Sequence, residues 1–215
     1  MSGLITGISL AMNHFIVYAG LFTIPFVLFQ IGKKKLNFVR LGVNYVFLLY
    51  ILCVIGLVFF PLPGMTGAGV KEYFRVQPVP FQFIKDILRE TPFIWNQPRT
   101  YLSAITDWAV LQVVFNVAMF VPLGLYLRFN FHFTGKKVVV ISFLFSCFIE
   151  IGQLTGLFFL FPGAYRLGDV DDLMINTLGG LIGYGIMRWI EKKAEEEQIM
   201  ELFDIRIEKK KTAEA

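Results

Sequence analysis

The sequence is poor in charge, cysteine and histidine, and each shortage narrows the class of protein. Charged residues make up 17% of the 215 residues, against about 25% in soluble domains. The two cysteines, Cys53 and Cys147, lie inside hydrophobic runs and are expected to be buried free thiols. The two histidines, His14 and His132, lie far apart in the chain, so nothing indicates zinc. Basic stretches with interleaved aromatics are lacking outside the hydrophobic runs, which argues against a nucleic-acid partner.

What the sequence has instead is long uncharged runs, beginning with a first stretch that meets no charge before Lys33. Uncharged runs of this length are typical of helices that cross the hydrocarbon core of a bilayer. They predict an all-α integral membrane protein, a bundle of about five transmembrane helices in one domain over residues 1–190. The five expected spans are residues 4–31, 41–60, 108–127, 138–160 and 172–190.

The last span is short. Leu173 to Met187 covers only about 22 Å at 1.5 Å per residue, against a hydrocarbon core of about 30 Å. Asp172 and Arg188 at its two ends are therefore expected close to the membrane boundaries. Arg188 is long enough to reach the interface, whereas Asp172 is short, so it either thins the bilayer locally or faces the protein interior.

The basic residues predict the orientation. They concentrate in residues 32–40, in residues 128–137 and after the last span, which five spans place on one side. By the positive-inside rule that side is cytoplasmic, together with the charged tail 191–215. The N-terminus and residues 62–107 are then outside.

The outer segment contains one stretch with helical periodicity, from Pro80 to Glu90. Phe81, Ile84 and Leu88 recur at helical spacing with charged residues between them. Two interpretations stay open, a short amphipathic helix in the membrane interface and a loop packed on the helix ends.

Polar residues inside the spans are the candidates for function. A charged side chain in a span costs at least about 2.5–3.5 kcal/mol, and Glu150 is the clearest case, with Gln153 one turn away on the same face. Asn116 lies about 12 Å inside the third span and Glu150 about 15 Å inside the fourth. These depths predict one polar chamber, shared by the last three spans and open to the outer face.

The last span supplies the partner surface, because four residues form one stripe along it: Asp172, Asn176, Gly179 and Gly183. The polar end of this stripe presents a carboxylate and an amide, and the glycine end lets another helix pack closely.

The loop before this span adds Arg166, Asp169 and Asp171. The guanidinium of Arg166 can form a bidentate pair with a carboxylate or a phosphate. The carboxylates of Asp169 and Asp171 could supply oxygen ligands to Mg²⁺ or Ca²⁺. No other cofactor is expected. For Gln112, Asn116 and Gln153, simple hydrogen bonding between helices is an equal alternative.

Three motifs together resemble the VanZ-like family of bacterial membrane proteins, over about residues 41–190. Arg166 to Gly183 has the form Arg-x-x-Asp-x-x-Asp-x-x-x-Asn-x-x-Gly-x-x-x-Gly, Glu150 to Gln153 is Glu-x-x-Gln, and Asn116 to Gly124 is Asn-x-x-x-Phe-x-Pro-Leu-Gly. Pro80-Phe81 resembles a further pair of the family. One stretch departs from the family pattern. Before Pro80 the family would have an Asn-Leu-type run, whereas this sequence has Gln77-Pro78-Val79.

The resemblance implies a bacterial cell membrane protein associated with lowered susceptibility to teicoplanin and other lipoglycopeptide antibiotics. It also implies a polar ligand-binding motif made of Asn116, Glu150, Gln153, Arg166, Asp169, Asp172 and Asn176.

The residues leave the type of function open. One hypothesis is a non-enzymatic protein that binds a membrane lipid, a lipid-linked envelope precursor or a lipoglycopeptide in an outer-leaflet groove. A second is an enzyme on an envelope lipid or its precursor, with Glu150 or Asp172 as general base. A third is proton-coupled transport with Glu150 as the intramembrane carboxylate, against which the lack of a recognisable inverted repeat argues. Nothing in the sequence indicates an oligomeric state.

Overall fold

The computed structural model describes residues 38–59, 76–161, 163–164 and 166–196, and four single positions, 21, 24, 25 and 28. Its elements are α2 (Phe38–Phe59), β1 (Val76–Gln77), α3 (Gln82–Glu90), α4 (Arg99–Ile105), α5 (Trp108–Phe131), α6 (Gly135–Leu154), α7 (Gly156–Phe159), β2 (Gly168–Asp169) and α8 (Val170–Glu196). The predicted first span, the start of the outer segment and most of the charged tail lie outside these residues.

Three of the described helices are long and apolar enough to cross a membrane: α2, α5 and α6. Their surfaces fit that role, because large apolar side chains such as Val46, Phe115 and Leu144 are exposed, as expected where lipid is the solvent. Helix α8 is not among the three, since glycines and Asn176 dilute its apolar residues. The count of five spans therefore stays a prediction.

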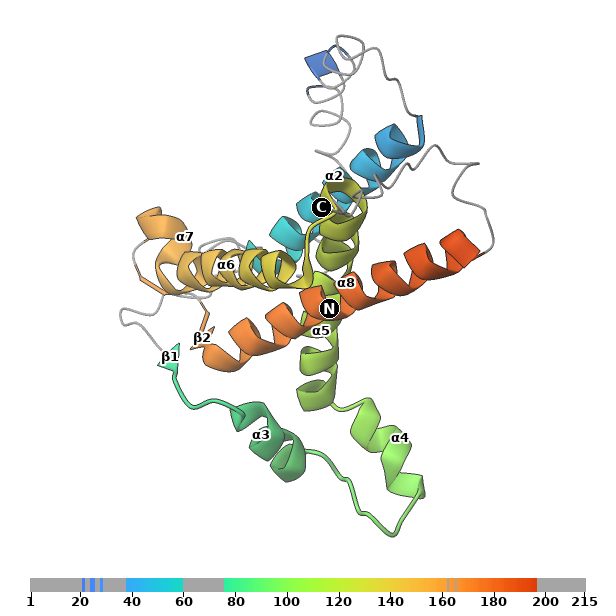
Figure 1. The fold of residues 1–215 in the computed structure, drawn as a ribbon. Helices are drawn as coiled ribbons and strands as arrows, with labels where there is room; N and C mark the ends of the chain where they lie inside the picture. Colours follow the sequence, from blue (N-terminus) through green and yellow to red (C-terminus); the bar gives the residue numbers. More distant parts are fainter. Residues whose placement is uncertain are drawn as a thin grey trace, which may run out of the picture.

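Helix α5 runs through the centre of the fold, and α8 crosses it obliquely (Figure 1). The side chain of Asp107 accepts a hydrogen bond from the backbone N–H of Ala109 (3.0 Å), which explains the start at Trp108. Pro122 removes one donor from the middle of the helix. Close by, the Tyr50 hydroxyl of α2 donates to the Met119 carbonyl at 2.6 Å, which fastens α2 to this weakened turn.

The crossing of α5 and α8 is made by glycines, as the small-residue stripe predicts. A Cβ on Gly179 would lie 2.3 Å from the Val117 carbonyl oxygen, and one on Gly183 would lie 2.1 Å from that of Val121. From the other side, a Cβ on Gly124 would lie 2.0 Å from the Gly180 carbonyl oxygen. The two backbones therefore touch, and this contact fixes the depth of the polar end of α8 against α5.

A buried ion pair joins the same two helices at their other ends. Arg128 of α5 and Glu191 of α8 lie 2.8 Å apart, with side chains only 12% and 5% exposed. The guanidinium also donates to the carbonyl oxygens of His132 and Phe133, past the end of α5. Arg128 therefore holds the turn that follows its own helix and also holds α8.

The prediction of one helix over residues 138–160 is wrong at its end. The helix ends at Leu154 and the backbone then turns left-handed, with φ of 62° at Gly156 and 58° at Leu157. Gly156 accepts this turn without a steric cost, and the Thr155 hydroxyl accepts from the Phe158 N–H. Glu150 therefore lies only about 6 Å from the end of its helix by the rise per residue, whereas the prediction placed it about 15 Å from the end of a longer helix.

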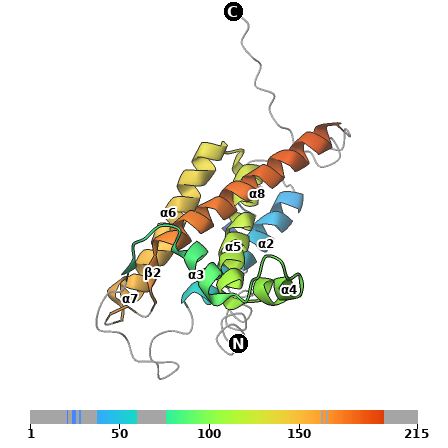
Figure 2. The ribbon, with the colours of Figure 1, turned by 90° about the horizontal axis from the view of Figure 1, so that it is seen from below.

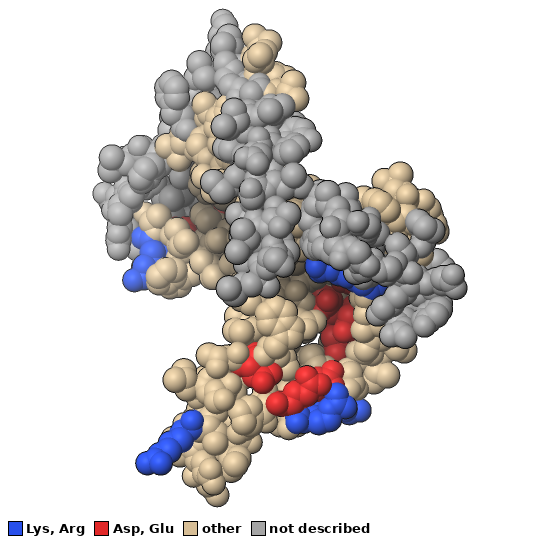
Figure 3. All heavy atoms as spheres, turned by 180° about the vertical axis from the view of Figure 1, so that it is seen from behind, with Lys and Arg blue, Asp and Glu red and all other residues tan. Residues whose placement is uncertain are grey.

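The segment between α2 and α5, which is predicted to lie outside, folds into more structure than predicted. Of the two interpretations of Pro80 to Glu90, the structure has the helix, as α3, with Ile84 and Leu88 exposed on its apolar side. The second short helix, α4, and the strand β1 were not predicted. Figures 1 and 2 both place α3 and α4 beside the N-terminal end of α5. Acidic and basic side chains gather at the end that carries α3 (Figure 3), where Arg89 pairs with Asp86 and Glu90.

Candidate functional site

The predicted polar residues of α5, α6 and α8 come together. Asn116 of α5 donates from Nδ2 to Oδ1 of Asp172 at 2.5 Å. Asn176, one turn further along α8, donates from Nδ2 to the Ser146 hydroxyl of α6 at 2.9 Å. The Ser146 hydroxyl lies 3.5 Å from the Asp172 carbonyl oxygen. Side chains from three helices therefore form one connected cluster.

Glu150 ties this cluster to the strand before α8. Its Oε2 accepts a hydrogen bond from the Asp169 backbone N–H at 3.0 Å. The side chain is buried, and Asp169, Asp172 and Arg166 lie close enough to interact with it through their charges. Glu150 thus stands among three other charged groups near the end of α6.

Asp171 has a structural partner that the sequence did not reveal. Its carboxylate accepts hydrogen bonds from the backbone N–H groups of Phe81 (2.5 Å) and Phe83 (2.9 Å), at the start of α3. The residue is only 2% exposed. A carboxylate at a helix N-terminus satisfies free N–H groups and complements the helix dipole. Asp171 therefore anchors α3 to the start of α8.

Gln77 also contributes to the contacts around Asp171. The sequence analysis noted this residue only as part of a departure from the family pattern. The strands β1 and β2 pair in parallel, with Gln77 opposite Asp169. Gln77 Nε2 lies 3.2 Å from Oδ1 of Asp169 and 3.4 Å from Oδ2 of Asp171. A two-residue strand has no periodicity, so no pattern in the sequence could have indicated this contact.

Asp169 is half-buried and lies outside the helices. Its Oδ1 accepts from the Asp171 backbone N–H at 2.8 Å as well as from Gln77. Burial raises the pKa of the Asp169 carboxyl above its ordinary value, and the nearby carboxylates of Asp171 and Asp86 act in the same direction. Across the described part of the chain, no group of three His, Cys, Asp or Glu side chains is arranged to hold a metal ion.

Gln153 stands apart from the cluster. Its Nε2 donates to the Val58 carbonyl oxygen at 3.0 Å, and the last carbonyls of a helix such as α2 lack partners within the helix. Gln153 therefore joins α6 to α2, which is the structural alternative that the sequence analysis kept open. Gln112 makes no contact that bears on the site.

Arg166 is the cation of the site and is exposed. Its Nη2 lies 3.5 Å from the Leu57 carbonyl oxygen, at the limit of a hydrogen bond. Among the residues that the structure describes, Arg166 forms no salt bridge, and neither do Glu150, Asp169, Asp171 and Asp172. The site therefore presents a guanidinium that interacts with the carboxylates of Glu150 and Asp172 through charge but forms no direct salt bridge with them.

One further polar atom in the cluster lacks a partner. Asn176 is 2% exposed and uses its Nδ2 on Ser146, but its Oδ1 meets no donor among the described residues. The Ser142 hydroxyl, one turn before Ser146 in α6, is likewise buried and has no hydrogen-bond partner in the described part of the chain. A buried acceptor without a donor is costly, so this atom is suited to accept a hydrogen bond from water or a ligand.

One of three comparisons with known proteins found a match. No curated protein and no solved structure matches the chain. The model of one family, described as VanZ/LLP1, matches residues 47–191, which contain every member of the cluster and most of the described fold. The chain belongs to the VanZ/LLP1 family.

Proposed function

We propose that this membrane protein binds an envelope lipid or a lipid-anchored glycopeptide at the cluster, and so lowers susceptibility to teicoplanin-type antibiotics. The observation that carries the proposal is Arg166, an exposed guanidinium without a salt bridge among the described residues. A guanidinium suits the phosphate or carboxylate of such a ligand.

The surroundings of Arg166 support a ligand with a polar head and an apolar tail. Glu150, Asp169 and Asp172 offer acceptors for hydroxyl or amine groups. The apolar side chains of Phe158, Phe159 and Leu160 are exposed next to the end of α6, where an acyl chain would lie. Because Glu150 is about one turn from the end of its helix, the head group would reach the cluster without crossing the bilayer.

The test is the change Arg166→Gln in a teicoplanin-susceptible bacterial host. Removing the guanidinium is expected to cost about 2 kcal/mol of binding, or roughly thirtyfold in affinity, and to return the host to the susceptibility of cells without the protein. The matched control is Arg99→Gln on the exposed helix α4, which removes the same charge away from the cluster.

Membrane levels of both variants are compared by immunoblot, and binding of lipoglycopeptide to the purified proteins is measured in nanodiscs. Unchanged resistance and binding in Arg166→Gln, at normal membrane levels, would refute the proposal.

The enzymatic alternative is favoured by one observation. Glu150 and Asp172 interact through their charges and form no salt bridge among the described residues, so no direct ion pair occupies a carboxylate that could take a proton from a substrate. Turnover of a lipid-linked substrate by the purified protein, lost in Glu150→Gln, would assign the function to this alternative.

A further inference from the structure

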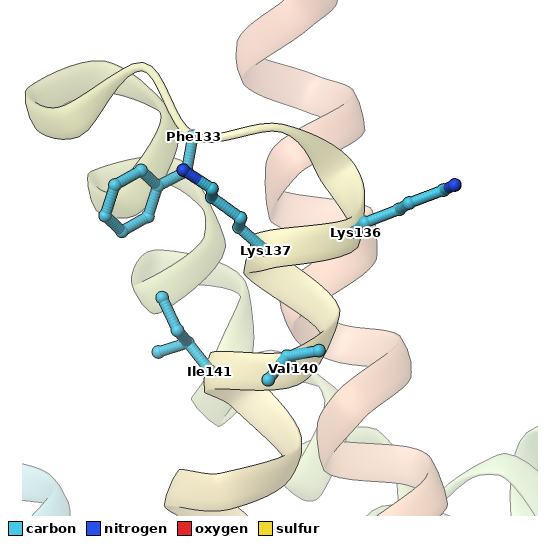
Figure 4. A pocket seen from close by; sticks show the side chains of 5 residues that line it. All are labelled: Phe133, Lys136, Lys137, Val140 and Ile141. Carbon is cyan, nitrogen blue, oxygen red and sulfur yellow. The ribbon is translucent and has the colours of Figure 1, made fainter.

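A second feature with the chemistry of a ligand site lies at the other end of α6 from Glu150. It is a hollow of about 270 Å³ at the junction of α5 and α6. Its lining residues are Phe133, Lys136, Lys137, Val140 and Ile141 (Figure 4). Ligand pockets that enclose a small molecule measure roughly 300–1,000 Å³, so this hollow can hold part of a ligand but not surround it.

The hollow combines an apolar floor with a basic rim. Val140 is exposed, and Ile141 and Phe133 pack against the core. Lys137 extends over Phe133, with its Nζ 5.4 Å from the centre of the ring, whereas Lys136 extends to the other side of the helix (Figure 4). The cation–π contact holds the ammonium of Lys137 above the apolar floor.

The positive charge at this rim has no counter-ion in the described part of the chain. Neither lysine forms a salt bridge there. The first turn of α6 contains no acidic residue, although that is where a helix favours negative charge. An anion is therefore the complementary occupant.

The position of the hollow identifies the kind of anion. Helix α6 is long and apolar enough to cross a membrane, so its first turns lie where the hydrocarbon core meets the head groups. A lipid there has its phosphate at the level of the lysines and its acyl chain at the level of Val140 and Ile141. A soluble anion would leave the apolar floor empty.

We propose that the hollow binds one anionic phospholipid, with its phosphate on Lys137 and the upper part of an acyl chain on Phe133, Val140 and Ile141. By the positive-inside rule this is a lipid of the cytoplasmic leaflet. The site is separate from the cluster around Arg166 and does not depend on the function proposed for it.

The test uses the full-length protein, purified in detergent and examined by native mass spectrometry with added phosphatidylglycerol or phosphatidylcholine. The wild type is expected to retain phosphatidylglycerol preferentially. Lys137→Gln is expected to weaken that binding about fivefold, since a basic residue near an anionic surface contributes about 1 kcal/mol, and to leave the retention of phosphatidylcholine unchanged.

Lys136→Gln is the matched control, because it removes the same charge from a neighbour whose ammonium extends away from the hollow. Its loss is expected to be clearly smaller. Val140→Asn tests the apolar floor and is expected to weaken the binding of both lipids.

Three outcomes would overturn the proposal. Equal retention of phosphatidylglycerol and phosphatidylcholine would show that the hollow does not select an anionic lipid. Equal losses in Lys136→Gln and Lys137→Gln would indicate a diffuse attraction to the basic segment. Displacement of phosphatidylglycerol by millimolar inorganic phosphate would show that the hollow takes a soluble anion.

Discussion

Among the single side chains, Asp171 and Asp172 are neighbours with different tasks. Asp172 meets Asn116, within the polar cluster that the sequence predicted among the last three spans. Asp171 was grouped with Asp169 as a candidate for a divalent cation, yet its oxygens accept from the backbone of Phe81 and Phe83. Every residue except proline carries a backbone N–H, so no residue type marked these donors, and the sequence could not reveal the partner of Asp171.

The anchoring role of Asp171 predicts a loss of stability when its carboxylate is removed. Asp171→Ala leaves the N–H groups at the start of α3 without their charged acceptor, which is expected to lower the free energy of unfolding by about 2 kcal/mol. The midpoint of thermal unfolding in detergent measures this change. The control is Asp86→Ala on α3, whose partner Arg89 is largely exposed, and which is expected to change stability by less than about 1 kcal/mol. Equal midpoints for the two variants would disprove the anchor.

Between helices, the sequence predicted close packing along α8 but not the break in α6. Gly179 and Gly183 lie on the polar stripe, and their spacing alone indicated a helix that touches another backbone. The sequence did not indicate that α6 ends at Leu154, because Leu157 to Leu160 are as apolar as the residues of a transmembrane span. Hydrophobicity therefore extended the predicted helix past Gly156, and it placed Glu150 too far from the end of that helix.

The crossing of α5 and α8 predicts opposite effects for two glycines. Gly124→Ala puts a Cβ 2.0 Å from the Gly180 carbonyl oxygen, so the helices must separate, at a cost of about 1–3 kcal/mol. Gly185→Ala in α8 has no atom within 4 Å and is expected to be neutral or to stabilise by about 0.5–1 kcal/mol, since glycine is a weak helix former.

Unfolding in detergent measures both glycine variants, and ligand binding gives a second readout. Separation of the helices would lengthen the contact between Asn116 and Asp172, so Gly124→Ala is expected to weaken binding at the cluster, whereas Gly185→Ala is not. Equal stability of the two variants would contradict the crossing.

In the described part of the bundle, two groups of charged residues lie at opposite ends of α6. Glu150, Asp169 and Asp172 gather near its end, with α3 and Arg166 beside them. Arg128, Lys136 and Lys137 lie around its beginning. Which compartment can reach the cluster depends on the orientation of the bundle, which the positive-inside rule predicts.

The predicted orientation is testable by labelling single cysteines in intact cells. In a background with Cys53 and Cys147 replaced by Ala, Lys85→Cys on α3 and Lys136→Cys on α6 each expose one thiol at an end of the bundle. A maleimide that does not cross membranes is expected to label Lys85→Cys and to leave Lys136→Cys unlabelled until the cells are opened. The reverse pattern would place Glu150 and Arg166 at the cytoplasmic surface. A lipoglycopeptide outside the cell could then not reach them, and the outer-leaflet function would fail even if the geometry of the cluster held.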